Sequence, residues 1–165
     1  MAVQPGRFSA DAEGGFVVFL IGVRFNKPWK VHKWWPVTRA MPKMLRMLDD
    51  HPELGCLGHH QWNGRTAIVV QYWRSLEHLE RFATDQELPH LEPWRRFNRR
   101  VGDSGDVGIW HETYKVRAGD YEAMYGNMPV FGLAAATRHV PIGHKGHAAP
   151  ARLGSSTDHP AVDPY

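Results

Sequence analysis

An Asn-Gly pair, Asn63-Gly64, lies between two runs of strand-forming residues in LGHHQWNGRTAIVVQYW, residues 57–73. Asn-Gly is the pair that most readily takes positive φ at both central positions of a type I′ turn, so this stretch predicts a β-hairpin. With a two-residue loop, Trp62 faces Arg65 and His60 faces Ala67. The remaining elements flank this hairpin in the sequence.

The segment before the hairpin has the pattern of a strand followed by a helix. Residues 16–26 are rich in β-branched and aromatic side chains and are apolar at both alternating sets of positions. That pattern is typical of a strand covered on both faces. From Val31 to Asp50 the apolar residues recur at steps of three and four, which predicts a helix. We expect Pro36 in its first turn and a kink at Pro42.

The segment after the hairpin has the opposite order, a helix and then a strand. Ser75 is a good helix N-cap, and helical spacing continues to about residue 100 with interruptions at Pro89 and Pro93. Residues 106–116 then alternate as a strand. The resulting order β-α-β-β-α-β predicts an α+β, ferredoxin-like fold, in which a four-stranded antiparallel sheet has both helices on one face.

Composition divides the chain into three regions. Residues 1–15 are polar and small, which indicates a loosely docked N-terminal arm, and residues 16–140 form the folded domain, with a short extra strand near residues 121–126. Residues 141–165 are Gly, Pro, Ala, Ser and His without a period, so we expect disorder there. Because the first strand is apolar on both sides, its sheet needs a second cover, and a second copy of the chain would supply it. We therefore expect a homodimer.

Charge and cysteine content exclude several classes. The formal net charge is only +3, which does not indicate nucleic-acid binding. The single cysteine, Cys56, cannot form an intrachain disulfide. The most apolar run, residues 16–23, is too short to span a bilayer, and no signal peptide is recognisable. We expect a cytoplasmic protein without membrane association.

Strand alternation sorts the hairpin side chains into two faces. The aliphatic face, expected to meet the helices, carries Leu57, His59, Ile68, Val70 and Tyr72. The other face, expected to meet a partner sheet, carries Gly58, His60, Trp62, Val69, Gln71 and Trp73. His59 and His60 point to opposite faces, so they do not form a metal site, and no Cys/His spacing typical of zinc occurs.

Three segments, VVFLIGVRFNKPWKVHKWWP, IVVQYWRSLEHLERFA and RRVGDSGDVGIWHETYKV, resemble an uncharacterised bacterial family described as monooxygenase-like. The likeness covers most of the range from Gly6 to Leu133. The family is placed in the dimeric α/β-barrel superfamily, which implies a homodimer whose two sheets close a barrel. That superfamily includes cofactor-free monooxygenases, haem-degrading monooxygenases, haem-containing aldoxime dehydratases and members without known catalysis.

The resemblance implies a pocket between helices and sheet in each subunit. Haem-degrading relatives take a histidine ligand from the second helix, and His90 is the nearest match, although the rest of their motif is absent here. Cofactor-free relatives deprotonate a phenolic substrate and hold it for oxygen. The cofactor is therefore either none or haem.

His111 is the main candidate for chemistry, because a neutral imidazole on a rigid strand can serve as base, donor or ligand. The alternative is a core histidine bonded to a backbone carbonyl. Tyr72 or Glu112 is the expected orienting group. The candidate substrate pocket consists of Trp34, Trp35, His59, Trp73, Trp94, Trp110 and Tyr114.

Three functions stay open on this sequence. The first is a small-molecule monooxygenase, an oxidoreductase for a hydrophobic or aromatic substrate. The second is a haem enzyme of the same fold, an oxygenase or an aldoxime-dehydratase-like lyase with His90 or His111 as axial ligand. The third is a non-enzymatic dimeric module that binds a hydrophobic ligand.

Overall fold

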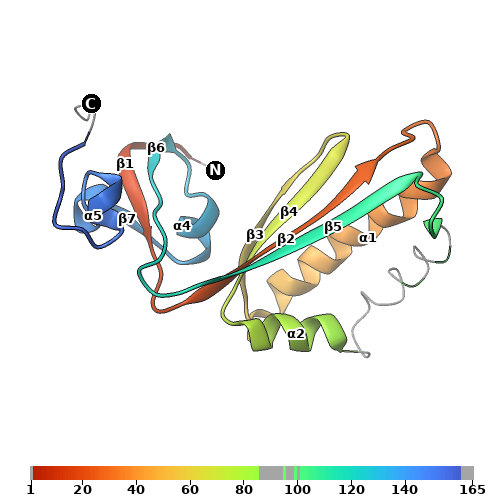
Figure 1. Ribbon diagram of the computed structural model, residues 1–165, viewed down its shortest axis with the longest axis horizontal. Helices are drawn as coiled ribbons and strands as arrows, with labels where there is room; N and C mark the ends of the chain where they lie inside the picture. Colours follow the sequence, from red (N-terminus) through yellow and green to blue (C-terminus); the bar gives the residue numbers. More distant parts are fainter. Residues whose placement is uncertain (1, 86–94, 96–98, 100, 161–165) are drawn as a thin grey trace. The chain divides into compact units, whose positions relative to one another are not determined.

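The structure is a computed structural model and describes residues 2–85, 95, 99 and 101–160 (Figure 1). The chain divides into two compact units. Unit 1 comprises Met1–Val17 and Tyr114–Tyr165, and unit 2 comprises Val18–Thr113. No helix among the described residues is long and apolar enough to cross a membrane.

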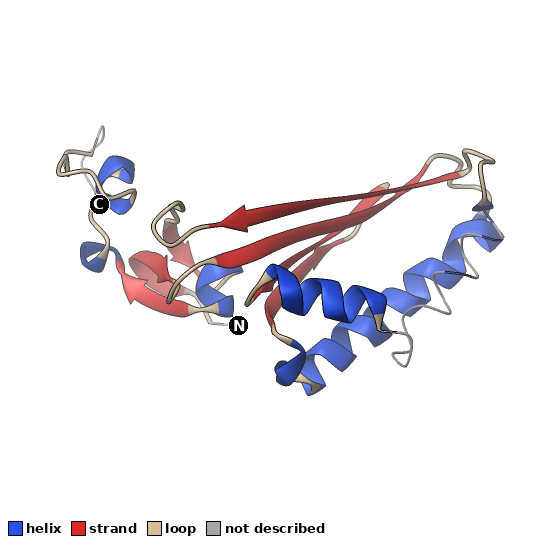
Figure 2. Ribbon diagram, turned by 60° about the horizontal axis from the view of Figure 1, so that its bottom comes forward, coloured by secondary structure: helices blue, strands red, loops and turns tan. Residues whose placement is uncertain are grey.

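Unit 2 is built on a four-stranded sheet with the order β3-β4-β2-β5. The strands are β2 (Phe16–Phe25), β3 (Cys56–Trp62), β4 (Thr66–Trp73) and β5 (Val107–Val116), and the helices are α1 (Val31–Asp50) and α2 (Leu76–Thr84). Both helices lie on the same side of the sheet (Figure 2). The predicted α+β, ferredoxin-like fold is confirmed, since the chain order βαββαβ gives this strand order.

The first helix has the predicted bounds but not the predicted role for Pro36. α1 runs as one helix over 20 residues with Pro36 and Pro42 inside it. Pro36 is the sixth residue of α1, so the expectation that it lies in the first turn is wrong. A connecting 3₁₀ turn, η1 (Pro52–Leu54), then leads to Gly55, whose φ of 91° lets the chain reverse into β3.

The hairpin forms, but its predicted register is wrong by three residues. Trp62 pairs with Ile68 and His60 with Val70, and β4 begins only at Thr66. Neither Asn63 nor Gly64 has the positive φ that a type I′ turn requires. Instead, Asn63 Oδ1 accepts a hydrogen bond of 2.7 Å from Gln61 Nε2.

An odd shift in register moves one strand's side chains to the other face. In the structure Trp73 and Gln71 are almost fully buried. The Trp73 indole donates to Gln71 Oε1 at 2.9 Å, and its ring lies 5.2 Å from that of Phe82 in α2. The expectation that Trp73 and Gln71 face a partner sheet is therefore wrong. Burial of this large ring and its polar partner favours the observed register over the turn preference of Asn-Gly.

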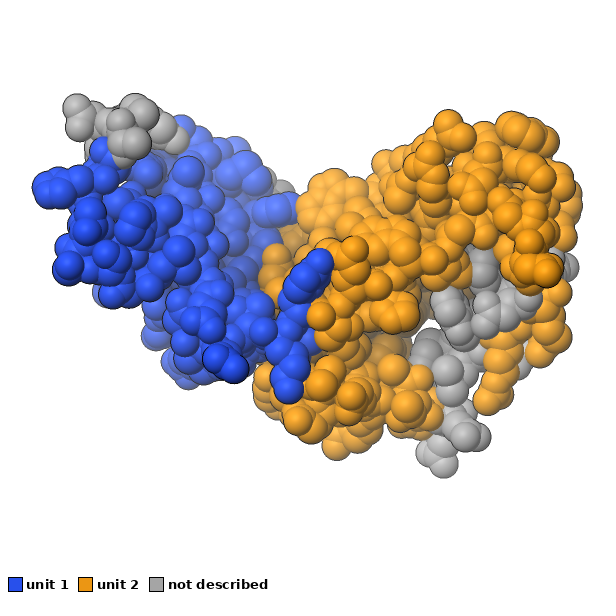
Figure 3. All heavy atoms as spheres, viewed as in Figure 1, with its two compact units in different colours: residues 1–17, 114–165 blue, residues 18–113 orange. Residues whose placement is uncertain are grey.

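Unit 1, coloured blue in Figure 3, contains a second, three-stranded sheet, whose strand order is β6-β1-β7. Its strands are β1 (Gln4–Asp11), β6 (Tyr125–Met128) and β7 (Arg138–Pro141), and its helical segments are α4 (Gly132–Ala136), η2 (Ile142–His144) and α5 (Ala149–Arg152). β1 pairs antiparallel with both neighbours, with Phe8 opposite Tyr125 and Ala10 opposite His139.

Two expectations for the ends of the chain are therefore not met. Residues 1–15 contain β1 instead of a loose arm, and part of the range 141–165 is packed instead of disordered. Ser9 and Ala10 of β1 are buried, and so are Ile142 and Ala148 near the C-terminal end. Strands of four residues are too short to show a period, so only their pairing with β1 reveals them. Unit 1 and unit 2 thus divide the chain differently from the expected boundaries.

Candidate functional site

The helix-facing side of the unit 2 sheet is set by its packing. Val23 and Val107 are buried against Val101, with Trp34 of α1 and Phe25 packed on them. Alternation then places the other odd-numbered residues of β2, β4 and β5 on this side. The aromatic layer between sheet and helices is formed by Phe19, Phe25, Trp34, Trp73 and Phe82.

His111 lies at the margin of this layer. It is exposed, and its ring centroid is 5.9 Å from that of Phe19 with a tilt of 43°. β5 is an edge strand of the sheet, which leaves the imidazole accessible from solvent while one side of its ring contacts an aromatic neighbour. An accessible imidazole beside an apolar surface can take a proton from a bound molecule. The alternative of a fully buried core histidine does not apply.

His59 lies on the same side of the sheet and is paired with a carboxylate. Its Nε2 is 2.9 Å from Asp49 Oδ1 near the end of α1, and its side chain is 17% exposed. A carboxylate on one ring nitrogen fixes the orientation of the ring and leaves the other nitrogen for a second partner. His60, on the opposite face, has its pKa lowered by burial and by the neighbouring His59.

Tyr72 and Glu112 lie on the face away from the helices. Tyr72 pairs with Gly58 in the observed register, so the prediction that it faces the helices is wrong. Glu112 is adjacent to His111 and therefore points to the other side of β5. β2 separates β4 from β5, so Tyr72 and Glu112 are at least two strand spacings apart, on the order of 10 Å. The structure does not bring the three predicted catalytic residues together.

The predicted pocket residues take different positions. Trp34 is half-buried, donates to Pro28 O at 2.9 Å and has its ring 4.7 Å from Phe25. Trp35 is half exposed, with the Arg39 guanidinium 5.9 Å from its ring. Trp73 is a core residue, as described above. Among the predicted site residues that the structure describes, Trp34, His59 and His111 lie at the helix-facing layer with some exposure.

The remaining aromatic candidates are outside this layer. Trp110 lies over Gly22 on the opposite face of the sheet, where a Cβ added to the glycine would be 2.4 Å from the indole nitrogen. Tyr114 is 51% exposed and belongs to unit 1. His90 and Trp94 lie outside the described residues.

The described residues do not build a haem site. A haem needs an axial ligand and an enclosing distal side. His111 is exposed and supplies no enclosure, while His90 is not among the described residues. Within the described ranges there is also no group of three or more His, Cys, Asp or Glu side chains that could hold a metal ion. The thiol of Cys56 has its pKa raised to about 11 by burial, so it is not a reactive thiolate near neutral pH.

Residues 16–133 match the family described as Monooxygenase af470-like. The chain belongs to the Monooxygenase af470-like family. The matched range contains His59, Tyr72, His111 and Glu112, and it ends within α4, before β7, η2 and α5 of unit 1. The membership applies to most of the chain, and it includes all of unit 2.

Two relatives are similar to this member of the Monooxygenase af470-like family. A protein named Monooxygenase af470 from Aspergillus fumigatus is 32% identical over 133 residues, covering 75% of this chain and 45% of that protein. The chain thus spans less than half the length of that relative. A solved structure from Bacteroides thetaiotaomicron, described as a conserved protein of unknown function and possible oxidoreductase, is 11% identical with a TM-score of 0.42, over 62% of this chain and 99% of that chain.

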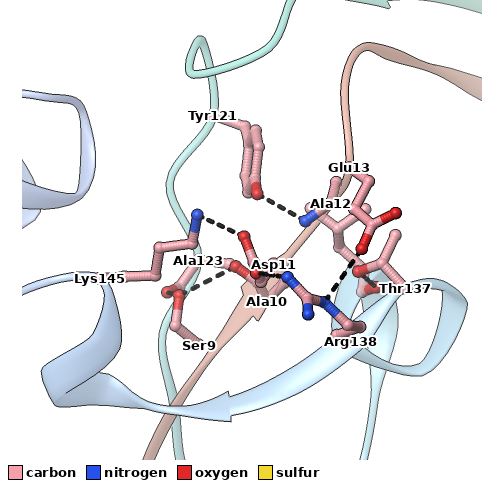
Figure 4. Close-up of polar contacts among 11 residues, drawn as sticks. Ser9, Ala10, Asp11, Ala12, Glu13, Tyr121, Ala123, Thr137, Arg138 and Lys145 are labelled. Atoms are coloured by element: carbon pink, nitrogen blue, oxygen red, sulfur yellow. Dashed lines mark hydrogen bonds and ion pairs between the residues drawn. The ribbon is translucent and has the colours of Figure 1, made fainter.

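Unit 1 contains a polar cluster around Asp11 that the sequence pattern does not predict. The Asp11 carboxylate contacts both Lys145 and Arg138, and the Tyr121 hydroxyl accepts a hydrogen bond of 2.7 Å from Ala12 N (Figure 4). The sequence does not predict a role for Lys145, because residues 141–165 have the composition of a disordered tail. The strand-like run Arg7-Phe8-Ser9-Ala10 was the available signal, since a strand so close to the N-terminus needs partners elsewhere in the chain.

Proposed function

We propose that the protein is a small-molecule monooxygenase that acts on a hydrophobic, phenol-type aromatic substrate beside the helix-facing layer of unit 2. Membership of the Monooxygenase af470-like family supports the reaction class. The observation that carries the site is the position of His111, an accessible imidazole on a rigid strand against Phe19. Phe19 and the nearby layer offer an aromatic surface for a flat substrate.

His111 acts as the proton acceptor in this proposal. It removes a proton from an activated ring methylene or its phenolic tautomer, and the resulting anion reacts with O₂. One oxygen atom becomes the new carbonyl oxygen of the substrate and the other leaves as water. Because conversion of CH₂ to C=O releases four electrons and reduction of O₂ consumes four, the substrate itself supplies all the electrons.

The test uses 1,8-dihydroxyanthrone as probe substrate, with oxygen uptake and ¹⁸O₂ incorporation as readouts. We expect one ¹⁸O atom in the carbonyl product and a loss of rate in His111→Gln of about 100-fold or more, the size typical of a lost general base. His144→Gln, a change at an exposed histidine of unit 1, serves as matched control. Undiminished rate in a folded His111→Gln variant would refute the role of His111.

The same preparation separates the other two functions. A Soret band after addition of haem, abolished in His90→Ala or His111→Ala, would replace this proposal with a haem enzyme. Quenching of tryptophan fluorescence by the anthrone without oxygen uptake would replace it with a ligand-binding module.

We also propose that the face of the unit 2 sheet away from the helices meets a second copy of the chain. Ile68, Val70 and Tyr72 lie on this face, and each keeps part of its side-chain surface exposed in the single chain, where a second copy could cover it. Light scattering after size exclusion should give a dimer for the wild type and a monomer for Val70→Lys. Glu80→Lys, on the exposed side of α2, should stay dimeric.

A further inference from the structure

Unit 1 contains a hollow of about 250 Å³ next to β1. Four alanines line it, Ala10, Ala12, Ala118 and Ala123, and Tyr121, Lys145, Glu122 and Arg152 add polar or charged groups. A water molecule occupies about 30 Å³ in the liquid, so the space corresponds to roughly eight waters, or a small organic molecule. Short side chains along three segments of the chain keep it open.

The ammonium group of Lys145 is held at this hollow with its charge fixed. Its Nζ is 2.5 Å from Asp11 Oδ1 and 6.0 Å from the centroid of the Tyr121 ring. These contacts, the bond to Asp11 foremost, raise the pKa of Lys145, so the group stays protonated and is an anchor for negative charge, not an amine nucleophile. An ammonium has three donor protons, and the contact with Asp11 uses one of them, which leaves protons for a further acceptor.

Asp11 does not cancel the positive charge around it. Its single carboxylate lies between Lys145 and Arg138. The further acidic group, Glu13, is 3.8 Å from Arg138 and its side chain is 83% exposed, where solvent screens the pair. With Glu13 these four charges sum to zero, and of the four residues Lys145 is the one that lines the hollow.

The Tyr121 hydroxyl supplies a second donor. Its oxygen accepts the 2.7 Å hydrogen bond from Ala12 N. A phenol oxygen has one proton of its own, which it can donate while it accepts this bond. Figure 4 shows the Tyr121 hydroxyl and the Lys145 ammonium on the same side of β1.

The second cation that lines the hollow, Arg152, is already paired. Its Nε and one terminal nitrogen contact the same oxygen, Oε1, of Glu122, it also donates to Gly146 O and His147 O, and its side chain is only 6% exposed. Arg152 thus holds the last helix, α5, against the segment before β6 and contributes no free charge.

We propose that the unit 1 hollow binds a small organic carboxylate with a compact apolar body. The carboxylate accepts hydrogen bonds from Lys145 and the Tyr121 hydroxyl, and the body lies against the alanine walls. A charge-assisted hydrogen bond favours this acceptor over a neutral amide of the same shape. This site is separate from the proposed oxygenase site and does not depend on it.

Benzoate is the probe, titrated into the full ¹⁵N-labelled chain at constant ionic strength, with benzamide as its neutral isostere. We expect saturable shifts of the amide signals of Gly119, Tyr121 and Ala123, and no saturation with benzamide. Lys145→Gln should weaken binding by about tenfold or more, and Tyr121→Phe by about threefold to tenfold, as expected for the loss of one charge-assisted or one neutral hydrogen bond.

Lys115→Gln is the matched control, since Lys115 is an exposed lysine of unit 1 that does not line the hollow. It should leave the affinity within about twofold, the range expected for screening of one surface charge. Tyr121→Phe keeps the ring that packs edge-on against Phe16 at 5.3 Å, so it tests the hydroxyl alone if Lys145→Gln fails to fold. Equal affinity in Tyr121→Phe and wild type, shifts confined to unit 2, or no saturation with benzoate would overturn the proposal.

Discussion

Asp106 is a buried carboxylate placed directly before β5. Its side chain is 3% exposed, and its two oxygens lie 2.8 Å from Lys27 Nζ and Lys30 Nζ respectively. The two lysines belong to the connection between β2 and α1, so the ion pairs tie this connection to the start of β5. The hydrogen bonds from Lys27 and then Lys30 lower the pKa of Asp106 to about 2.

This pKa predicts how stability changes in acid. Because the folded-state pKa is below the ordinary value of 3.8, Asp106 stabilises the fold at higher pH and loses that contribution as the pH falls from about 4 to about 2. Asp106→Asn should lower the urea midpoint near neutral pH and show a shallower decline over this acid range. Asp103→Asn, at an exposed site nearby, should follow the wild-type curve. A parallel acid decline in Asp106→Asn and wild type would contradict the assignment.

Single residues also mark how far the sequence could be interpreted. Alternation alone separates His111 from Glu112, and it correctly makes His59 and His60 face opposite sides. It cannot say which side the helices cover, and the prediction for β4 is wrong because the most aliphatic face of this strand is not the inner one. The inner face of β4 instead carries Gln71, whose side-chain oxygen is satisfied by the Trp73 indole. A buried hydrogen-bonded pair of this kind is invisible in a hydrophobic pattern.

At the scale of elements, Gly22 of β2 and the Trp110 indole of the neighbouring strand β5 make a close contact. A Cβ on Gly22 would lie 2.4 Å from Trp110 Nε1 and 2.9 Å from Ala67 O of β4. Gly108, on the same face of the neighbouring strand, would have its nearest contact at 3.5 Å, which is an ordinary distance.

These two glycines form a matched pair. Gly22→Ala must push aside an indole ring and a backbone carbonyl, so we expect a loss of unfolding free energy of about 1–3 kcal/mol. Gly108→Ala should be neutral or gain up to about 1 kcal/mol, because alanine restricts the unfolded chain. Denaturant unfolding of both variants measures the difference. A similar effect at both positions would mean that Trp110 does not lie over Gly22.

The order of elements in unit 2 was predictable because each long element has its own period. The bounds of α1 and the existence of the hairpin follow from local spacing and composition. The register does not follow from them, because it depends on which side chains of β4 are buried by α2. That contact joins residues of two different elements, Trp73 and Phe82. The pattern in residues 57–73 favours a two-residue turn at Asn63-Gly64. The observed register, in which Trp73 is buried, requires a longer loop instead.

At the scale of the whole molecule, the structure differs most from the sequence-based expectation in residues 141–160. Composition predicts disorder from residue 141 onward, whereas Ile142 and Ala148 are buried at 6% and 4% exposure. Lys145 and Arg152 link this segment to Asp11 of β1 and to Glu122. Small residues and prolines can pack when a strand such as β1 offers a surface, and composition does not reveal that surface.

Two aliphatic residues of this segment distinguish the alternatives. Ile142 is buried, whereas Leu153 is 53% exposed. Ile142→Ala leaves a cavity and should cost about 2–5 kcal/mol, while Leu153→Ala, the control, should cost much less. Hydrogen exchange at the β1 and β7 amides gives the local readout, because Ile142 directly follows β7 and its loss should speed exchange there. If this segment had no fixed packing, both alanine variants would keep the wild-type exchange rate at Val140 and the wild-type unfolding free energy. If Ile142→Ala alone changes these two quantities, residues 141–160 are part of the fold of unit 1.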